Sequence, residues 1–221
     1  MPASVDRVNS GRALVGWVRL VVAAAILVAV AATFLETASR TTVNPFNFFG
    51  YFTVQSNLIG LVVLVLAALA RPVSQRRAVA ITLTRGCATS YLVVVGIVYA
   101  VLLAPLGAAG GVPLPWANVI MHVVVPIYMA ADWLFAPDRR RLPWQRFWVL
   151  LVYPLVWCVV VLVRGATDGW VPYPFLDPSN GYGSVAVFVA LITVVVSVVG
   201  AAVWGVSRLA RQPKRMRSLP T

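Results

Sequence analysis

The chain has 221 residues, of which 61% are hydrophobic and only 11% are charged. About a quarter of the residues of a soluble domain are charged, so this composition excludes an ordinary soluble protein and indicates an integral membrane protein. The formal net charge of +12 does not indicate a nucleic-acid partner, because the basic residues gather in short segments between apolar runs. We expect these segments to contact membrane lipids, above all the anionic lipids of the cytoplasmic leaflet.

Six apolar runs follow one another along the chain. Each approaches the length of about 20 residues that a membrane-spanning helix needs. The predicted spans are 13–35, 49–70, 79–104, 116–136, 147–164 and 185–207. We therefore predict an all-α fold, a six-transmembrane-helix bundle over residues 13–207, with no room for a separate soluble domain. Residues 1–12 form a predicted cytoplasmic N-terminal tail, and residues 208–221 a basic cytoplasmic tail that we expect to be disordered.

The basic residues predict the orientation of this bundle. They concentrate in the two tails and in the segments 71–77 and 137–146, whereas the other connections hold only Arg40 and Arg164. By the positive-inside rule, both termini then lie in the cytoplasm. A single lysine among many arginines hints at a high-GC bacterium, so we expect a multi-pass protein of the bacterial plasma membrane.

The segment 44–57 differs from the apolar runs on either side of it. Pro45 and Gly50 interrupt a helix, and the aromatic residues around them are typical of a membrane–water interface. Four polar residues then open the second span, namely Thr53, Gln55, Ser56 and Asn57. Polar side chains at this depth must face protein or water. They indicate either hydrogen bonding between helices or a reactive hydroxyl at the head of a helix.

His122 is the only histidine of the chain and lies in the fourth span. Asn118 comes one turn before it on the same helix face, and Pro126 one turn after it, which predicts a kink. At a helix rise of about 1.5 Å per residue, His122 and Thr53 lie at similar depths below the outer surface. The two side chains are therefore a candidate base and nucleophile, with Asn57 or Asn118 steadying an oxyanion. The alternative is that His122 only joins two helices by a hydrogen bond.

Two charged residues lie within the spans near their inner ends. Arg85 of the third span and Asp132 of the fourth match in depth, so we predict a structural ion pair, with Arg19 as a competing partner. Two cysteines, Cys87 and Cys158, lie in apolar runs and are expected to be free thiols. With a single histidine and no Cys/His cluster, we expect no metal site and no cofactor.

The outer segment 165–184 contains the motif WVPYPFLD, in which prolines alternate with large side chains. Such a segment is rigid and suits the membrane interface. It is either an aromatic anchor or a lid over a cavity, with Asp168 and Asp177 as its acidic residues. We leave both interpretations open at this point.

Four segments together resemble the Pr-six-Pr family of bacterial six-helix membrane proteins. They are FNFFGYFTVQSNL, MHVVVPIYMAADWL, the Tyr153–Pro154 pair and RGATDGWVPYPFLD. That family is distantly similar to the eukaryotic androgen-induced membrane proteins and the androgen-dependent regulator of tissue factor pathway inhibitor. Those proteins are threonine hydrolases that cleave fatty acid esters of hydroxy fatty acids.

The remote similarity implies roles for particular residues. Thr53 matches the threonine nucleophile, His122 with Pro126 matches the histidine, and residues 173–177 match a loop motif of those hydrolases. Ser56 is an alternative reactive hydroxyl. The function expected from the resemblance is an intramembrane threonine-dependent hydrolase of lipid esters. Its substrate-binding residues would be Gln55, Asn57, Asn118, Tyr173, Phe175 and Asp177. The alternatives are a non-catalytic lipid-binding or transport protein and a scaffold without a small-molecule site.

Overall fold

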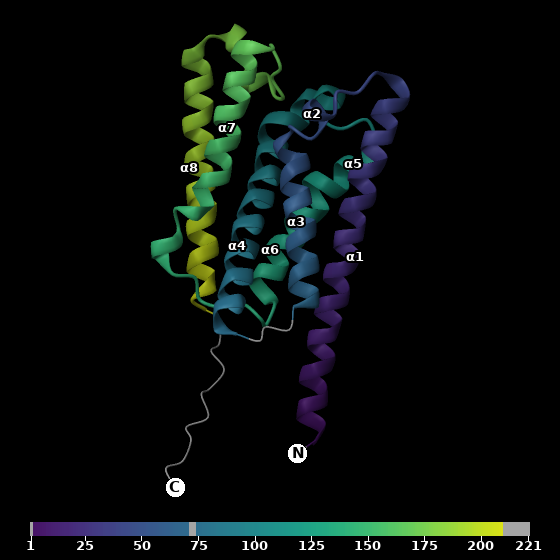
Figure 1. Cartoon of the computed structure of the whole chain (residues 1–221), viewed down its shortest axis with the longest axis vertical. Coiled ribbons are helices and arrows are strands. Elements are labelled where there is room, and N and C mark those ends of the chain that lie inside the picture. The colour runs from purple at the N-terminus through teal and green to yellow at the C-terminus, as the bar shows by residue number, and fades with distance from the viewer. Residues whose placement is uncertain (1, 71–73, 210–221) are drawn as a thin grey trace.

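The computed structural model describes residues 2–70 and 74–209, and helices are the sole regular secondary structure among them. The main helices are α1 (Pro2–Arg40), α2 (Pro45–Phe48), α3 (Phe52–Leu69), α4 (Gln75–Val98), α5 (Pro115–Val119), α6 (Val125–Phe135), α7 (Val149–Thr167) and α8 (Tyr182–Ser207). Within the described ranges six helical segments are long and apolar enough to cross a membrane. The predicted six-helix fold is confirmed, and Figure 1 shows its helices side by side in one upright bundle.

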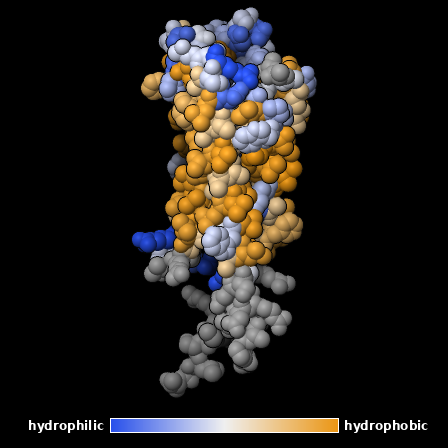
Figure 2. Space-filling model, turned by 90° about the vertical axis from the view of Figure 1, so that its right-hand side faces the viewer, coloured by the Kyte–Doolittle hydropathy of each residue, from blue (hydrophilic) through white to orange (hydrophobic). Residues whose placement is uncertain are grey.

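The six spans alternate in direction along the bundle. They comprise Gly11–Arg40, Phe52–Leu69, Gln75–Gly107, Pro115–Phe135, Trp144–Thr167 and Tyr182–Ser207. The described chain begins and ends at the lower end of the bundle in Figure 1. We call this the charged end, and the opposite end, where α2 and the connection between α7 and α8 lie, the lid end. The face seen in Figure 2 carries a wide apolar belt, with polar residues at the lid end, as expected of a multi-pass membrane protein.

The helices form two groups. In the larger group α1 packs on α3, α3 on α4, and α4 on α6, around a core of fully buried side chains. That core includes Ile26, Leu64, Leu92, Met121, Val125 and Met129. The smaller group is the hairpin of α7 and α8, which packs mainly through α8 on α4 (Figure 1).

The first helix is longer than the predicted span. It runs from Pro2 to Arg40, through most of the expected N-terminal tail and into the first outer connection. The physical reason is that the next proline after Pro2 is Pro45, where α2 begins, so nothing between them breaks a helix. The predicted C-terminal tail lies outside the described residues from 210 onward, as do residues 71–73 of the connection after α3.

The fourth span is broken where Pro126 predicted a kink. A π-helical turn, Ile120–Val124, separates α5 from α6, because Pro126 has no N–H to offer the carbonyl of His122. A glycine of α4 faces this break: a Cβ on Gly96 would lie 3.3 Å from the His122 carbonyl oxygen and 3.0 Å from Pro126 Cβ. The helix α4 also ends in a π-helical turn, Tyr99–Leu103, at the same level. Such turns are frequent at functional sites.

Short helical segments complete the connections. They are the 3-10 segments Ala104–Gly110, Trp144–Arg146, Pro174–Leu176 and Pro178–Asn180. The last two belong to the connection between α7 and α8, residues 168–181, which we call the lid segment. It packs on the head of α8 and carries the WVPYPFLD motif.

Candidate functional site

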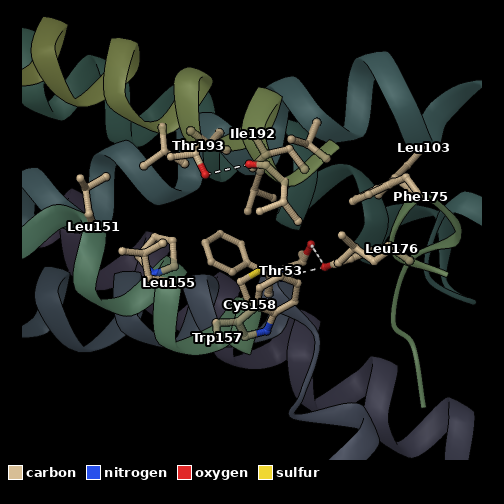
Figure 3. Close-up of a pocket in the computed structure, with 18 residues that line it drawn as sticks. Thr53, Leu103, Leu151, Leu155, Trp157, Cys158, Phe175, Leu176, Ile192 and Thr193 are labelled. Atoms are coloured by element: carbon tan, nitrogen blue, oxygen red, sulfur yellow. Dashed lines mark hydrogen bonds between the residues drawn. The ribbon is translucent and has the colours of Figure 1, made fainter. Parts of the chain in front are cut away.

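A cavity lies between the α7–α8 hairpin, α4, the head of α3 and the lid segment (Figure 3). The centre of a water-sized sphere can move through about 90 Å³ of it. Its lining is apolar apart from Thr53, Tyr173, Thr193, the ring nitrogen of Trp157 and the thiol of Cys158. The Thr193 hydroxyl donates to the Val189 carbonyl within its own helix. The hydroxyls of Thr53 and Tyr173 are therefore the main polar feature that the cavity offers to a ligand.

Thr53 and Tyr173 meet at the head of α3. The N-cap residue of α3 is Tyr51, which is not a usual capping residue, and the first turn of any helix has free N–H groups. The Tyr173 hydroxyl accepts a hydrogen bond from the Thr53 N–H at 3.3 Å and lies 3.4 Å from Thr53 Oγ1. The lid segment thus supplies the cap of α3 from a position 120 residues away in the chain.

Tyr173 is held in place by other aromatic rings. It stacks on Phe175 at 5.2 Å between ring centroids and meets Tyr51 edge to face at 5.7 Å. Its side chain is buried, and this burial raises the pKa of Tyr173 to about 12. The phenol therefore stays protonated at neutral pH, so it can donate a hydrogen bond to a ligand but does not serve as a base.

The aromatic stretch before α3 is fastened to α7. The Trp157 ring nitrogen donates to the Gly50 carbonyl at 2.8 Å, and the Tyr153 hydroxyl donates to Gln55 Oε1 at 2.9 Å. Gln55 in turn donates to the Phe49 carbonyl. Both ends of the Gln55 amide are thus engaged with protein, and Gln55 does not line the cavity. The predicted role of Gln55 in substrate binding therefore has no support in the structure. Its hydrogen bonds instead hold the aromatic stretch before α3 in position.

His122 lies on the far side of α3 and α4 from the cavity lining. It is buried, stacks on Tyr99 at 4.3 Å, and places Nδ1 3.1 Å from the Asn118 carbonyl oxygen. A nitrogen that faces a carbonyl oxygen donates, which leaves Nε2 as the acceptor. No hydrogen bond joins His122 to Thr53, although the structure describes both side chains. Their pairing as base and nucleophile stays a prediction.

The two asparagines expected near an oxyanion bind protein groups instead. Asn57 donates from Nδ2 to the Thr53 carbonyl at 2.9 Å and to the Met121 carbonyl at 3.4 Å. Asn118 donates to the Tyr99 hydroxyl at 2.6 Å. Both amide groups therefore tie helices together. Asn57 nevertheless links the first turn of α3 to the residue just before His122.

The remaining predicted residues of the lid segment divide into two kinds. Phe175 lines the cavity, and its role in substrate binding stays a prediction. Asp177 does not, because its carboxylate accepts the Ser179 N–H at 2.8 Å, a bond that lowers its pKa. Asp168 likewise accepts from Arg164 and from the Trp170 N–H. The two acids shape the lid segment in the structure, and neither reaches the cavity.

The wall that α7 and α8 provide to the cavity was not predicted from the sequence. Its one signal was Pro154, which has no N–H for the Leu150 carbonyl and so frees that oxygen. The Tyr91 hydroxyl of α4 donates to this carbonyl at 2.9 Å and fastens the lower part of α7 to the bundle. Pro154 itself lines the cavity one turn higher.

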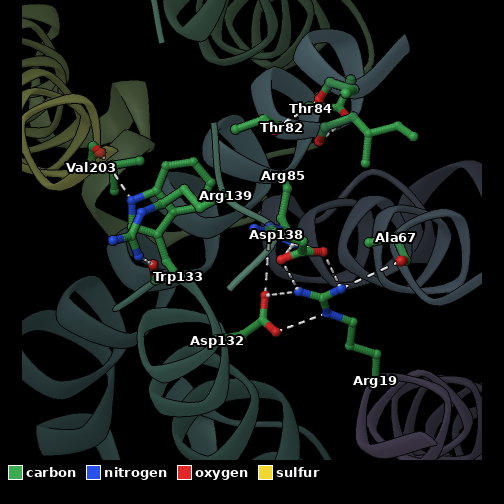
Figure 4. A network of polar contacts seen from close by, with 12 residues as sticks. Arg19, Ala67, Thr82, Thr84, Arg85, Asp132, Trp133, Asp138, Arg139 and Val203 are labelled. Carbon is green, nitrogen blue, oxygen red and sulfur yellow. Dashed lines mark hydrogen bonds and ion pairs between the residues drawn. The ribbon is translucent and has the colours of Figure 1, made fainter. Parts of the chain in front are cut away.

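The predicted ion pair is part of a larger cluster at the charged end (Figure 4). Arg85 Nε lies 3.6 Å from Asp132 Oδ2, but Arg19 is nearer, with Nε 2.8 Å from Asp132 Oδ1. Asp138, from the connection after α6, accepts hydrogen bonds from both arginines at 2.7–2.9 Å. Arg139 donates to the Trp133 carbonyl beside them. Arg19, Arg85 and Asp132 are all buried, so the cluster joins α1, α4 and α6 internally.

Comparisons with known proteins identify no relative of this chain. No family model, no curated protein and no solved structure matches the chain. The resemblance to the Pr-six-Pr family therefore rests on the sequence segments alone. In the part of the chain that the structure describes, His, Cys, Asp and Glu side chains form no group of three or more that would hold a metal ion. What the geometry offers is an apolar cavity inside a membrane bundle, with two hydroxyl groups on its wall.

Proposed function

We propose that this membrane protein binds the hydrocarbon chain of a lipid in the cavity, with the lipid's polar group at the hydroxyls of Thr53 and Tyr173. One observation carries the proposal, namely that an otherwise apolar cavity holds these two hydroxyls side by side at 3.4 Å. Small-molecule sites combine an apolar lining with a few placed polar groups in the same way.

The chemistry of the two hydroxyls indicates what kind of polar group they bind. One of the two hydroxyls donates to the other, which leaves the second proton for a ligand. Tyr173 is neutral at physiological pH, and its raised pKa keeps it so at higher pH. A ligand group that accepts hydrogen bonds, such as an ester carbonyl or a carboxylate, suits them best. A chain that leaves the bilayer gains nothing from the hydrophobic effect, because lipid tails are equally apolar. The preference of the cavity for one lipid over another therefore comes from these hydrogen bonds and from how well the hydrocarbon chain fits the cavity.

The bilayer is the natural source of such a ligand. Leu155 of α7 lines the cavity and is also 50% exposed on the outer face of the bundle. Leu155 therefore places one wall of the cavity on the outward-facing side of α7. A chain enters sideways past α7 and does not need to cross the aqueous surface.

The test uses Cys158, which lines the cavity, while Cys87 is buried elsewhere. In a Cys87→Ala background reconstituted in phosphatidylcholine nanodiscs, we would measure the rate of Cys158 alkylation with and without methyl octanoate. We expect the ester to slow alkylation, and Tyr173→Phe with Thr53→Val to weaken this protection. Equal alkylation rates with and without ester, across the concentrations tested, would show that the cavity does not bind such chains.

Ester hydrolysis is the second candidate function. The observation that favours it is the position of the Thr53 hydroxyl, on the cavity wall and in the first turn of a helix whose N–H groups point outward. Thr53 Oγ1 would attack the acyl carbonyl and its proton would go to the leaving alcohol, forming an acyl-threonine. Water would then cleave that ester, release the fatty acid and restore the hydroxyl. The predicted role of His122 in carrying that proton requires a rearrangement, because in the structure His122 faces Asn118 and Tyr99 and not the cavity.

Hydrolysis is tested separately from binding. We would follow release of p-nitrophenol from p-nitrophenyl octanoate by the purified protein. We expect Thr53→Val and His122→Ala each to abolish turnover and Ser56→Ala to retain it. Turnover that persists in both the Thr53 and the His122 variants would rule out this mechanism. It would not affect the binding proposal.

A further inference from the structure

We infer that the cavity selects its ligand by chain length, accepting a single unbranched hydrocarbon chain of roughly eight carbon atoms, with Leu151 and Val196 as its floor. The inference rests on the proposed binding function and adds to it the class of ligand. It follows from where the polar groups lie, from what closes the cavity beneath them, and from the distance between the two.

The polar groups and the floor lie at opposite parts of the cavity. Thr53 and Tyr173 are near the lid end, whereas Leu151 in the first turn of α7 and Val196 near the middle of α8 line the cavity farther from the lid segment. Figure 3 shows Leu151 on one side of the cavity, with Phe175 and Leu176 of the lid segment on the other. A ligand whose polar group is at Thr53 therefore extends its chain toward Leu151.

The cavity is closed immediately below these residues. The helices α7 and α8 touch there, because Gly200 has no side chain and Leu150 fills its place: a Cβ on Gly200 would lie 2.0 Å from Leu150 Cδ2. Leu150 and Trp204 are completely buried. The Tyr91 hydroxyl fixes the Leu150 backbone from the α4 side. A chain cannot lengthen in this direction without moving a fully packed layer, and such layers resist insertion.

The depth of the cavity follows from helix geometry. On α7 the lining runs from Leu151 to Cys158, and Cys158 is next to Trp157, which contacts the segment just before Thr53. Seven residues of α-helix span about 10 Å. The lining of α8, from Val189 to Val196, spans the same seven residues. A carbon–carbon bond of about 1.5 Å at a tetrahedral angle advances about 1.25 Å, so the depth matches roughly eight carbons.

The width of the cavity restricts the shape of the chain. The centre of a water-sized sphere can move through about 90 Å³ of the cavity, and over about 10 Å of depth this leaves room for about one hydrocarbon chain. Each methylene that fails to fit a hydrophobic pocket is worth about 10- to 200-fold in discrimination.

The experiment changes the floor in both directions. Val196→Phe fills the lower part of the cavity, and Leu151→Ala enlarges it. The matched control is Val198→Phe, because Val198 lies on the same helix but is 63% exposed on its outer face. For each protein we would measure protection of Cys158 in the Cys87→Ala background with methyl esters from butanoate to hexadecanoate.

We expect the parent protein to show strongest protection near octanoate, Val196→Phe to shift this optimum to shorter chains, and Leu151→Ala to longer ones. Decanoate should lose at least about tenfold in affinity in Val196→Phe, while Val198→Phe should behave like the parent. Protection that is equal for all chain lengths, or an optimum that neither floor variant moves, would overturn the inference and leave the binding function standing. Failure of every ester to protect Cys158 would instead remove the binding function itself.

Discussion

The two ends of this bundle bury polar side chains to a similar extent, but they differ in what surrounds these side chains. At the charged end Arg19 is 2% exposed and donates from all three of its guanidinium nitrogens, so its neighbours are packed against it. At the lid end Thr53 is 7% exposed, yet its hydroxyl lies on the wall of a cavity. One polar group completes the packing, and the other borders free space.

The difference follows from the cost of burying each kind of group. An unpaired charge in an apolar interior is so unfavourable that the fold must surround it with partners, as Asp132 and Asp138 surround Arg19. A hydroxyl costs far less to leave partly bonded, so it can stay available to a ligand. Within a membrane protein, a buried charge whose donors are all paired, as in Arg19, therefore indicates structure, whereas a hydroxyl beside a cavity is the better sign of a functional site. Arg85 departs from this pattern, because its Nε and Nη2 are buried without a hydrogen-bond partner.

The largest effect should come from breaking the charged end. Replacing Arg19 by Met leaves the buried Asp132 and the partly exposed Asp138 with Arg85 as their one direct arginine partner. The loss of one member of a buried pair such as Arg19–Asp132 costs about 3–5 kcal/mol. The matched control is Arg40→Met, because the Arg40–Glu36 pair is exposed and such pairs contribute about 0–1 kcal/mol. The measurement is the free energy of unfolding in detergent. Equal stability of the two variants would mean that the cluster does not hold the bundle together.

A smaller effect is expected where the two ends meet, at the close approach of α7 and α8. Gly200→Ala places a methyl group against Leu150, and overpacking of this kind costs about 1–3 kcal/mol. Gly205→Ala, on the same helix, is the control, since a Cβ there meets no atom within 4 Å. We expect only Gly200→Ala to lower the temperature of unfolding. A Gly200→Ala protein as stable as its control would contradict the tight floor on which the chain-length inference depends.

The smallest effect is a pH dependence that belongs to the charged end. Burial by itself raises the pKa of Asp138, but the hydrogen bonds from Arg19 and the charge of Arg85 outweigh it and hold that pKa well below its ordinary value of 3.8. A lowered pKa in the folded state stabilises the protein above the unfolded-state value, and this stability is lost as the pH falls toward the folded-state pKa. This pH-dependent contribution to stability is small, because the Asp138 side chain is 38% exposed and solvent screens its charge.

Unfolding of the parent protein and of Asp138→Asn at pH 7 and pH 3 measures this contribution. We expect the parent to lose more stability on acidification than the variant does. The same loss in both proteins would show that Asp138 does not carry the acid sensitivity of the cluster.

Much of the architecture was determined by the sequence itself. Six apolar runs of sufficient length were enough to predict six helices, because in lipid each backbone segment must satisfy its own hydrogen bonds, and a helix does so locally. The kink before Pro126 and the polar start of α3 at Thr53 were visible for the same reason, since both depend on neighbours in the chain. The depth of Arg85 and Asp132 was likewise a matter of counting along helices.

Which side chains meet depends on the tertiary structure and could not be predicted from the sequence. Depth along a helix says nothing about its rotation or its distance from other helices, and these depend on packing between segments far apart in sequence. For that reason Arg19 comes closer to Asp132 than Arg85 does, and Asp138 joins them from a connection. For the same reason Thr53 meets Tyr173, 120 residues away, while His122 stacks on Tyr99. The cavity itself arises from the gap that the α7–α8 hairpin leaves beside α4, and no local pattern in the sequence encodes such a gap.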